Sequence, residues 1–335
     1  PLGSLFAARL QQGGNDVSIL ARGERLAQLR AHGIVLVDAQ TEAQSVTRVN
    51  VVEALAPKDA YDLVLVIMRK NHALRILPVL ATNRRTPNVL FLMNNAAGPG
   101  ALVEALGEQR VLIGFPNSAG YREGYAVHCL TGTEDDKAYV PFGEVDGSIT
   151  DRTREVAHIL ESAPGLGAEI RTDMDTWLRY HVALLFPSLA PALYAAGVDN
   201  YRLARTRDLV VLAIRAMREG FHVLRSLGLP VTPSKFKMIE WLPEPILVPV
   251  MQRLLANPLM ETAWVKHAEA ARSEVEHLIT ESMTLARTTP VPTPTIDRLL
   301  QYCEPDAPKV SDGSAEIPLR LGGLLVGLGA LAMLV

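Results

Sequence analysis

Cysteine is scarce in this sequence. Only Cys129 and Cys303 occur among its 335 residues, and no CxxC spacing is present. Two distant cysteines are too few for a disulfide framework, and they lack the usual ligand pattern of a zinc site or a redox pair. We therefore expect a reducing, cytoplasmic environment and no metal centre.

A surplus of positive charge is also absent. Lysine and arginine total 33 against 36 acidic residues, so the net charge is -3, and no basic block stands out. Nucleic-acid binders carry a basic patch or stripe, so the composition excludes that class and favours a small-molecule substrate. The opening Pro-Leu-Gly-Ser has neither the basic region nor the apolar core of a secretory signal.

Long apolar runs are missing except after Arg320, where the fifteen residues Leu321–Val335 carry no charge. A helix needs about 20 apolar residues to cross a bilayer, so this run is short for a complete span. We interpret it as part of a membrane anchor that contacts the membrane and tethers a cytoplasmic protein. A core-packed or disordered tail is the alternative.

The first half of the chain alternates short β-branched runs with amphipathic segments, the pattern of a parallel α/β sheet. Residues 124–130 and 137–142 read as antiparallel additions joined by a polar turn. Strands are predicted at 16–20, 62–68, 88–93 and 111–114, and helices at 23–32, 71–82 and 99–106.

From Asp175 the periodicity becomes that of long helices, which predicts an all-α second domain. The helices are expected at 177–196, 207–227, 233–255 and 262–287, with a shorter one after Pro294. Length also favours two domains, because single cores rarely grow past about 250 to 300 residues. We predict an NADP-binding Rossmann domain at 1–170, a helical domain at 171–303, a linker at 304–317 and an apolar tail at 318–335.

A dinucleotide fingerprint is a strand followed by G-x-G-x-x-G at the start of a helix. Gly3 and Ser4 would open that helix, with Gly3 as the third glycine, so the sequence predicts that the first strand is missing and that restoring it improves NADPH binding. The second strand ends at Ala21 and Arg22, with Arg25 close by. Arginine there accommodates the 2′-phosphate, which favours NADP(H) over NAD.

Several blocks together resemble the ketopantoate reductase (2-dehydropantoate 2-reductase) superfamily, from Pro1 to about Tyr302. They are GSLFAARL with VSILARG, DLVLVIMRKNH, VLFLMNN, FGEVDG, DTWLRYHVAL and ARSEVEHL, in this order. The resemblance implies a Rossmann domain and a helical domain of the 6-phosphogluconate dehydrogenase-like type, with the active site in the cleft between them. It also implies reduction of a ketone by NADPH, as in pantothenate biosynthesis.

The resemblance assigns roles by position. Arg69 falls where the family has a basic residue near the adenosine 2′-phosphate, and Asn94 falls on the asparagine beside nicotinamide and substrate. Glu274 matches a glutamate that reaches cofactor and substrate, Thr262 a substrate-binding hydroxyl, and Ala119 the loop that passes the nicotinamide.

Three positions depart from the family pattern. Arg179 stands where the family has a lysine that protonates the ketone oxygen, and Ala183 and Pro187 replace two substrate-binding asparagines. Arginine can polarise a carbonyl but is a poor proton donor, since its pKa is above about 12. The neighbouring Tyr180 or His181 is therefore a candidate donor.

The leading hypothesis is an NADPH-dependent reductase of a 2-oxo acid or similar carbonyl, for which a homodimer is the candidate assembly. Arg179 and Asn94 would polarise the carbonyl while Glu274 orders the site. The alternative is a nucleotide-binding module without turnover, tethered to a membrane as a sensor or scaffold. A metal enzyme ranks third, because helical amphipathicity explains the shared face of Glu274, His277 and Glu281.

Overall fold

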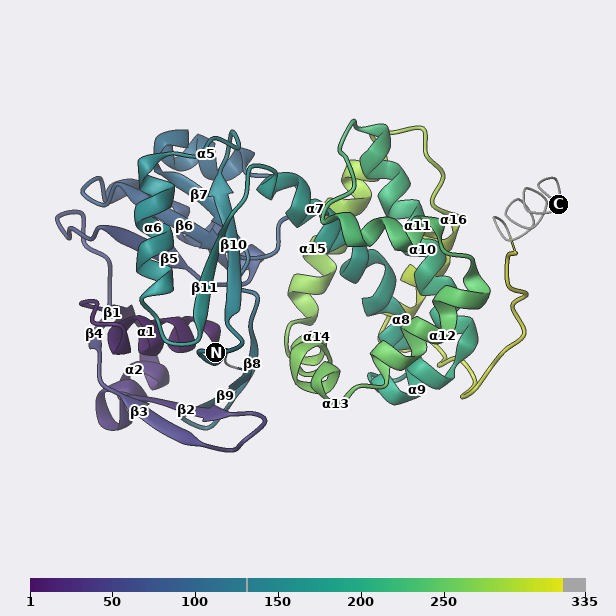
Figure 1. Ribbon diagram of the computed structural model, residues 1–335, viewed down its shortest axis with the longest axis horizontal. Coiled ribbons are helices and arrows are strands. Elements are labelled where there is room, and N and C mark those ends of the chain that lie inside the picture. Colours follow the sequence, from purple (N-terminus) through teal and green to yellow (C-terminus); the bar gives the residue numbers. More distant parts are fainter. Residues whose placement is uncertain (131, 322–335) are drawn as a thin grey trace. The chain divides into compact units, whose positions relative to one another are not determined.

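The computed structural model describes residues 1–130 and 132–321, apart from the side chains of Thr262, Ala263 and His267. The chain divides into two compact units. The first comprises Pro1–Leu178 with Thr262–His267, and the second Arg179–Glu261 with Ala268–Val335 (Figure 1).

A five-stranded sheet with the order β11-β10-β7-β6-β5 forms the centre of the first unit. β5, β6 and β7 are parallel, while β10 runs antiparallel to β7 and pairs in parallel with β11. The strands are β5 (Leu63–Val66), β6 (Asn88–Leu92), β7 (Val111–Gly114), β10 (Ala138–Glu144) and β11 (Leu166–Ile170).

Helices cover both faces of this sheet, which is why its strands are apolar on both sides. On β6, Val89 and Phe91 pack in one core, whereas Leu90 and Leu92 pack on the opposite face. The first face is covered by α3 (Lys70–Ala73), α4 (Leu77–Thr82) and α5 (Gly100–Leu106), and the second by α1 (Leu2–Gln12) and α6 (Asp151–Glu161).

A second sheet with the order β3-β2-β9-β8 lies beyond α1 and α2 (Gly23–His32). Its strands are β2 (Ile34–Asp38), β3 (Gln44–Thr47), β8 (Ala119–Glu123) and β9 (Ala126–Leu130). The segments predicted as antiparallel additions both pair in antiparallel ladders, but in two different sheets and not in one. β9 pairs antiparallel with β8 and in parallel with β2, while β10 pairs antiparallel with β7.

The strand after α1, β1 (Ser18–Leu20), pairs only with β4 (Asn50–Val52). In the described part of the chain no strand joins β1 to β5, although α1 packs against both sheets. The predicted fold class, a Rossmann-like sheet followed by an all-α part, is confirmed.

The second unit contains no strand among its described residues. Its central helix is α10 (Arg207–Ser226), and the predicted helix over 177–196 is α7 and α8 joined by a π-helix at Leu185–Leu189. The other α-helices after β11, of which α7 and α14 have residues in both units, are α7 (Met174–Leu184), α8 (Ala190–Ala195), α9 (Asn200–Arg205), α11 (Lys237–Trp241), α12 (Glu244–Leu255), α13 (Pro258–Met260), α14 (Lys266–Ala270), α15 (Arg272–Ala286) and α16 (Pro294–Leu300).

The predicted helix over 233–255 is divided at Leu242. This residue is extended, with φ -69° and ψ 131°, because the proline that follows it disfavours helical backbone. α11 therefore ends at Trp241 and α12 starts after Pro243.

The segment predicted as a linker is irregular but tightly held. Asp208 accepts hydrogen bonds from the backbone of Glu316 and Ile317, and Arg205 forms an ion pair with Asp312. Arg202 and Arg207 donate to carbonyls of the same segment. The stretch from 310 to 320 is thus fastened to α9 and α10.

No helix in the described ranges is long and apolar enough to cross a membrane. The predicted anchor falls almost entirely at 322–335, outside the described residues.

Candidate active site

Arginines gather at the amino end of α1. Arg25 donates from Nη2 to Ser4 Oγ at 3.0 Å and from Nη1 to the carbonyl of Tyr125 at 2.9 Å. Burial and the nearby Arg122 lower the pKa of Arg25. Burial, then the charges of Arg25, Arg122 and Arg69, lower the pKa of the Pro1 amine to about 6. A helix amino end surrounded by cationic side chains is an environment for phosphate groups.

Two predicted cofactor residues have local roles here. Arg22 precedes α2 and donates from Nε to the carbonyl of Glu53 at 3.2 Å. Gly3 lies in the first turn of α1, where an added Cβ would meet only the Ile67 carbonyl oxygen at 3.9 Å. That is an ordinary contact, so helix packing alone does not require glycine at position 3.

The residues after β6 lie at the carboxyl end of the parallel strands. Asn94 is 9% exposed, and its Oδ1 has no hydrogen-bond partner among the described residues. The next residue, Asn95, is 1% exposed and accepts hydrogen bonds from Lys70 Nζ at 2.5 Å and from the backbone of Gly98 at 3.0 Å. The loop that carries Asn94 is thereby fixed to the start of α3.

A buried hydroxyl follows the end of β7. Ser118 Oγ, like Asn95 Nδ2, has no hydrogen-bond partner in the part of the chain that the structure describes. Ala119 begins β8, and Lys266 Nζ lies 5.6 Å from the ring centre of Tyr121 on the same strand. Buried polar atoms without partners are costly unless a ligand satisfies them, and ligands bind at this edge of α/β sheets. These atoms and the basic amino end of α1 fit an amide-bearing dinucleotide.

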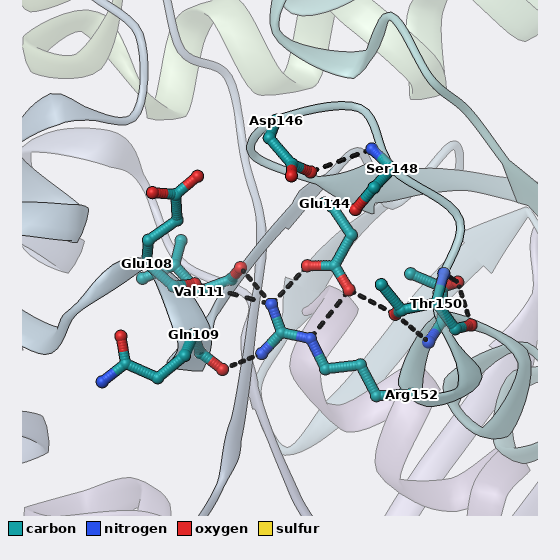
Figure 2. Close-up of polar contacts among 9 residues, drawn as sticks. Glu108, Gln109, Val111, Glu144, Asp146, Ser148, Thr150 and Arg152 are labelled. Atoms are coloured by element: carbon teal, nitrogen blue, oxygen red, sulfur yellow. Dashed lines mark hydrogen bonds and ion pairs between the residues drawn. The ribbon is translucent and has the colours of Figure 1, made fainter.

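The FGEVDG block is a structural clamp. Arg152 on α6 donates to the Glu144 carboxylate and to backbone carbonyls at Glu108, Gln109 and Val111, while Thr150 donates to Glu144 at 2.5 Å (Figure 2). Glu144 is 5% exposed. Asp146 accepts from the backbone of Ser148, and this bond lowers its pKa. These contacts join α6 to β10 and to the entrance of β7, and both oxygens of the Glu144 carboxylate accept hydrogen bonds from structural partners.

The two candidate proton donors beside Arg179 are unsuited to that role. Tyr180 is fully buried and donates its hydroxyl hydrogen to the Leu229 carbonyl at 2.9 Å, and burial raises its pKa to about 12. Burial lowers the pKa of His181 to about 4, so its ring is neutral at physiological pH. Burial therefore disfavours proton donation by either residue.

The other predicted residues of the helical part of the chain lie on α7, on α15 and on the two π-helices. Arg179 is half-buried on α7. Ala183 and Pro187 are both buried and offer no side-chain hydrogen bond. Glu274, in the first turn of α15, is 2% exposed. The side chain of Thr262, in the π-helix Glu261–Val265, lies outside the described part.

α15 also carries a histidine and a carboxylate side by side. His277 and Glu281 form an i,i+4 pair with Nε2 and Oε1 3.2 Å apart. No group of three histidine, cysteine or acidic residues in the described ranges is arranged to hold a metal ion.

The first part of the chain matches a known family model. Residues 1–144 match the family model described as ketopantoate reductase PanE/ApbA. These residues are therefore similar to that family. No curated protein sequence matches the chain.

Solved structures extend the likeness in fold over both units. A ketopantoate reductase from Ralstonia solanacearum MolK2 matches with a TM-score of 0.71 at 19% identity, covering 89% of this chain and 92% of its own. A 2-dehydropantoate 2-reductase from Geobacter metallireducens GS-15 gives 0.70 at 20%, with 90% and 95% covered. D-mandelate dehydrogenase with NADH and anilino(oxo)acetate gives 0.72 at 15%, with 90% and 94% covered. At these identities the ketopantoate reductase fold is what the likeness shows.

Four residues near the candidate site were not predicted from the sequence: Lys70, Asn95, Ser118 and Arg122. Lys70 and Asn95 directly follow the predicted site residues Arg69 and Asn94. The second basic residue and the second asparagine of these two pairs could therefore have been predicted from the sequence. Ser118 and Arg122 gave none, because the predicted strand began only at 124 and missed β8.

Proposed function

We propose that the protein is a nicotinamide-dependent oxidoreductase that reduces the carbonyl of a 2-oxo acid, with NADPH as the preferred reductant. The observation that carries this proposal is Asn94. A polar side chain that is 9% exposed at the carboxyl end of a central parallel strand, with its carbonyl oxygen unmatched in the described structure, is placed for a ligand. Bound nicotinamide supplies the hydride.

The preference for NADPH rests on charge. Arg25, Arg122 and Arg69 contribute positive charge at the amino end of α1, and Arg22 follows β1. The 2′-phosphate on the adenosine ribose of NADPH would form charge-assisted hydrogen bonds with such a cluster. NADH lacks this phosphate and so lacks these bonds.

An apolar substrate side chain is supported by Ala183 and Pro187. The family that the chain resembles has asparagines at these two positions, and an asparagine can hydrogen-bond a substrate hydroxyl. The buried apolar side chains of Ala183 and Pro187 cannot. The anilino(oxo)acetate in the D-mandelate dehydrogenase structure is an oxo acid derivative with an aromatic group. We therefore favour an aromatic or branched aliphatic 2-oxo acid over 2-dehydropantoate.

Reduction also needs a proton at the carbonyl oxygen. Arg179 can orient the carboxylate and polarise the carbonyl without donating. We assign the donation of a proton to the carbonyl oxygen to Lys266. It is exposed, lies one helical turn after Thr262, and its ammonium is held over Tyr121, two residues beyond Ala119. A lysine ammonium can give up a proton that a guanidinium retains.

The test is NADPH oxidation across a panel that includes phenylglyoxylate, 2-oxoisovalerate and 2-dehydropantoate. Asn94→Ala should lower kcat/KM at least about 100-fold, corresponding to roughly 3 kcal/mol of transition-state stabilisation. Asn88→Ala is the matched control, because Asn88 begins the same strand and its side chain only donates to the Asp62 carbonyl. Absence of turnover with every substrate would overturn the proposal.

A nucleotide-binding protein without turnover is the second candidate. This candidate is favoured because Arg179 stands where the family that the chain resembles has a proton-donating lysine. Burial also disfavours proton donation by the neighbouring Tyr180 and His181. Tight NADPH binding without oxidation of the cofactor would select this candidate.

A further inference from the structure

A stacked pair of rings lies on the hairpin formed by β8 and β9. Tyr121 and His128 are direct partners in its antiparallel ladder. Their ring centres are 4.9 Å apart, their planes differ by 7°, and both residues are half-buried. Cross-strand ring pairs of this kind stabilise a sheet and hold each ring in one orientation. The hairpin therefore determines the plane of the Tyr121 ring.

A carboxylate lies beside the same histidine. Glu123 Oε2 is 3.5 Å from His128 Nε2, but the Glu123 side chain is 76% exposed. An ion pair this open to solvent contributes little, and it exists only while the histidine is protonated. The stack on Tyr121, rather than this pair, therefore determines how the two rings lie.

An ammonium group lies near the Tyr121 ring. Lys266 is the first residue of α14, and its Nζ is 5.6 Å from the ring centre. This distance is within the range of about 6 Å in which the negative face of an aromatic ring attracts a cation. For an exposed side chain such as Lys266, the attraction favours the position over the ring by about two- to fivefold. The Tyr121 ring thus biases where the ammonium of a long, flexible side chain lies.

We propose that Tyr121 is a positioning residue, which holds the Lys266 ammonium in place for proton transfer. This inference rests on the proposed function, since it takes Lys266 as the proton donor. In that step an Nζ–H bond breaks and an O–H bond forms at the carbonyl oxygen while the carbonyl carbon receives the hydride, and a neutral amine remains. The ring attracts the ammonium and not the amine, so it holds the form of Lys266 that still carries the proton.

Steady-state kinetics of the full chain on the best 2-oxo acid test this role. Tyr121→Leu should lower kcat about two- to fivefold with a smaller change in KM, whereas Tyr121→Phe keeps the ring face and should keep the parent kcat. In a Lys266→Met background, Tyr121→Leu should cause no further decrease, because both changes act through one ammonium. Tyr139→Leu, at an exposed tyrosine on β10, is the control.

The outcomes separate this inference from the proposed function. An unchanged kcat in Tyr121→Leu, or the same decrease with and without Lys266, would overturn the positioning role and leave the proposed function intact. An unchanged kcat in Lys266→Met would reject proton donation by Lys266, and the positioning role with it. Absence of turnover in the parent chain would overturn both.

Nuclear magnetic resonance provides a readout that does not depend on activity. Reductive methylation with ¹³C-formaldehyde labels the lysine amines, and the signal that Lys266→Met lacks belongs to Lys266. Because an aromatic ring shields groups above its face, the methyl protons of Lys266 should resonate upfield of those of the other exposed lysines. Tyr121→Phe should keep this shift and Tyr121→Leu should abolish it. A Lys266 signal at the same position in the parent and in Tyr121→Leu would contradict the contact and the role built on it.

Discussion

Lys70 Nζ and Asn95 Oδ1 lie 2.5 Å apart in the interior of the first unit. Both residues are almost fully buried, at 3% and 1% exposure. A buried ammonium is costly unless it is hydrogen-bonded, so this contact determines where the loop after β6 can lie. Since Asn94 is the neighbour of Asn95, the contact also determines the position of Asn94.

Lys70→Met should release this loop. The expected result is a 10- to 100-fold decrease in kcat, roughly 1.4 to 2.8 kcal/mol, with a smaller change in KM, because Asn94 would lose its fixed position while remaining present. Steady-state kinetics on the best 2-oxo acid checks this. Lys70→Arg should recover part of the activity, and a Lys70→Met enzyme with unchanged kcat would contradict the positioning role.

The basic cluster at α1 leads to a prediction about cofactor choice. Arg122→Gln should weaken NADPH binding about tenfold and leave NADH binding nearly unchanged, because one charge-assisted contact to a phosphate contributes about 1 to 2 kcal/mol. Titration calorimetry with both cofactors measures the ratio. Arg154→Gln, a surface arginine on α6 paired with Asp151, is the control. Equal losses for both cofactors would remove Arg122 from 2′-phosphate recognition.

Proton donation by Lys266 predicts a loss of rate without a loss of binding. Lys266→Met should lower kcat at least about tenfold, roughly 1.4 kcal/mol, and change KM less, because the carbonyl oxygen would lose its proton donor. Lys235→Met, on the 3₁₀ helix Ser234–Phe236, is the control. A Lys266→Met enzyme that retains the parent kcat would eliminate this assignment.

Much of the fold could be predicted because its signals are local. The apolar runs 88–93 and 111–114 predicted the strands β6 and β7. Gly33 predicted the end of α2, where it is the C-cap residue. The partition of strands between two sheets could not be predicted in the same way. It depends on which distant strand each edge meets, as when β9 pairs in parallel with β2.

The site was predictable where a residue follows a central strand, as Asn94 does. It was not predictable where burial determines chemistry. Tyr180 is a plausible acid by residue type, yet its hydroxyl is committed to Leu229 and its pKa is raised to about 12. Similarly, the polar composition of 304–317 indicated a linker, whereas Asp208 and Arg205 hold that segment against α9 and α10.

The clamp around Arg152 should contribute strongly to stability. Arg152→Met removes the hydrogen bonds and the ion pair that Arg152 forms with Glu144. The nearly buried Glu144 carboxylate would then keep only its hydrogen bond from the Thr150 hydroxyl. Breaking a buried pair by removing one member costs about 3 to 5 kcal/mol, and the 21% exposure of the Arg152 side chain places this case near 3 kcal/mol. Urea unfolding measures the loss. Arg154→Met, an exposed pair with Asp151, should change stability by less than about 0.5 kcal/mol.

His181 should make the protein sensitive to mild acid. Burial lowers its pKa from 6.5 to about 4 in the folded state. The unfolded chain therefore binds a proton in this pH range that the folded chain does not, so stability is complete above pH 6.5 and decreases as the pH falls toward 4. The lowered pKa corresponds to a loss of about 3 kcal/mol across the range.

The measurement is the urea midpoint of His181→Gln and of the parent chain between pH 7 and pH 4.5. The parent should lose stability through this range, and the variant should lose less because residue 181 no longer takes up a proton on unfolding. His158→Gln, at an exposed position on α6, should retain the slope of the parent. Parallel slopes for the parent and His181→Gln would show that residue 181 titrates alike in both states. The acid sensitivity would then belong to carboxylates such as Glu244, whose pKa is lowered by the hydrogen bonds from Arg215 and Arg320 despite its burial.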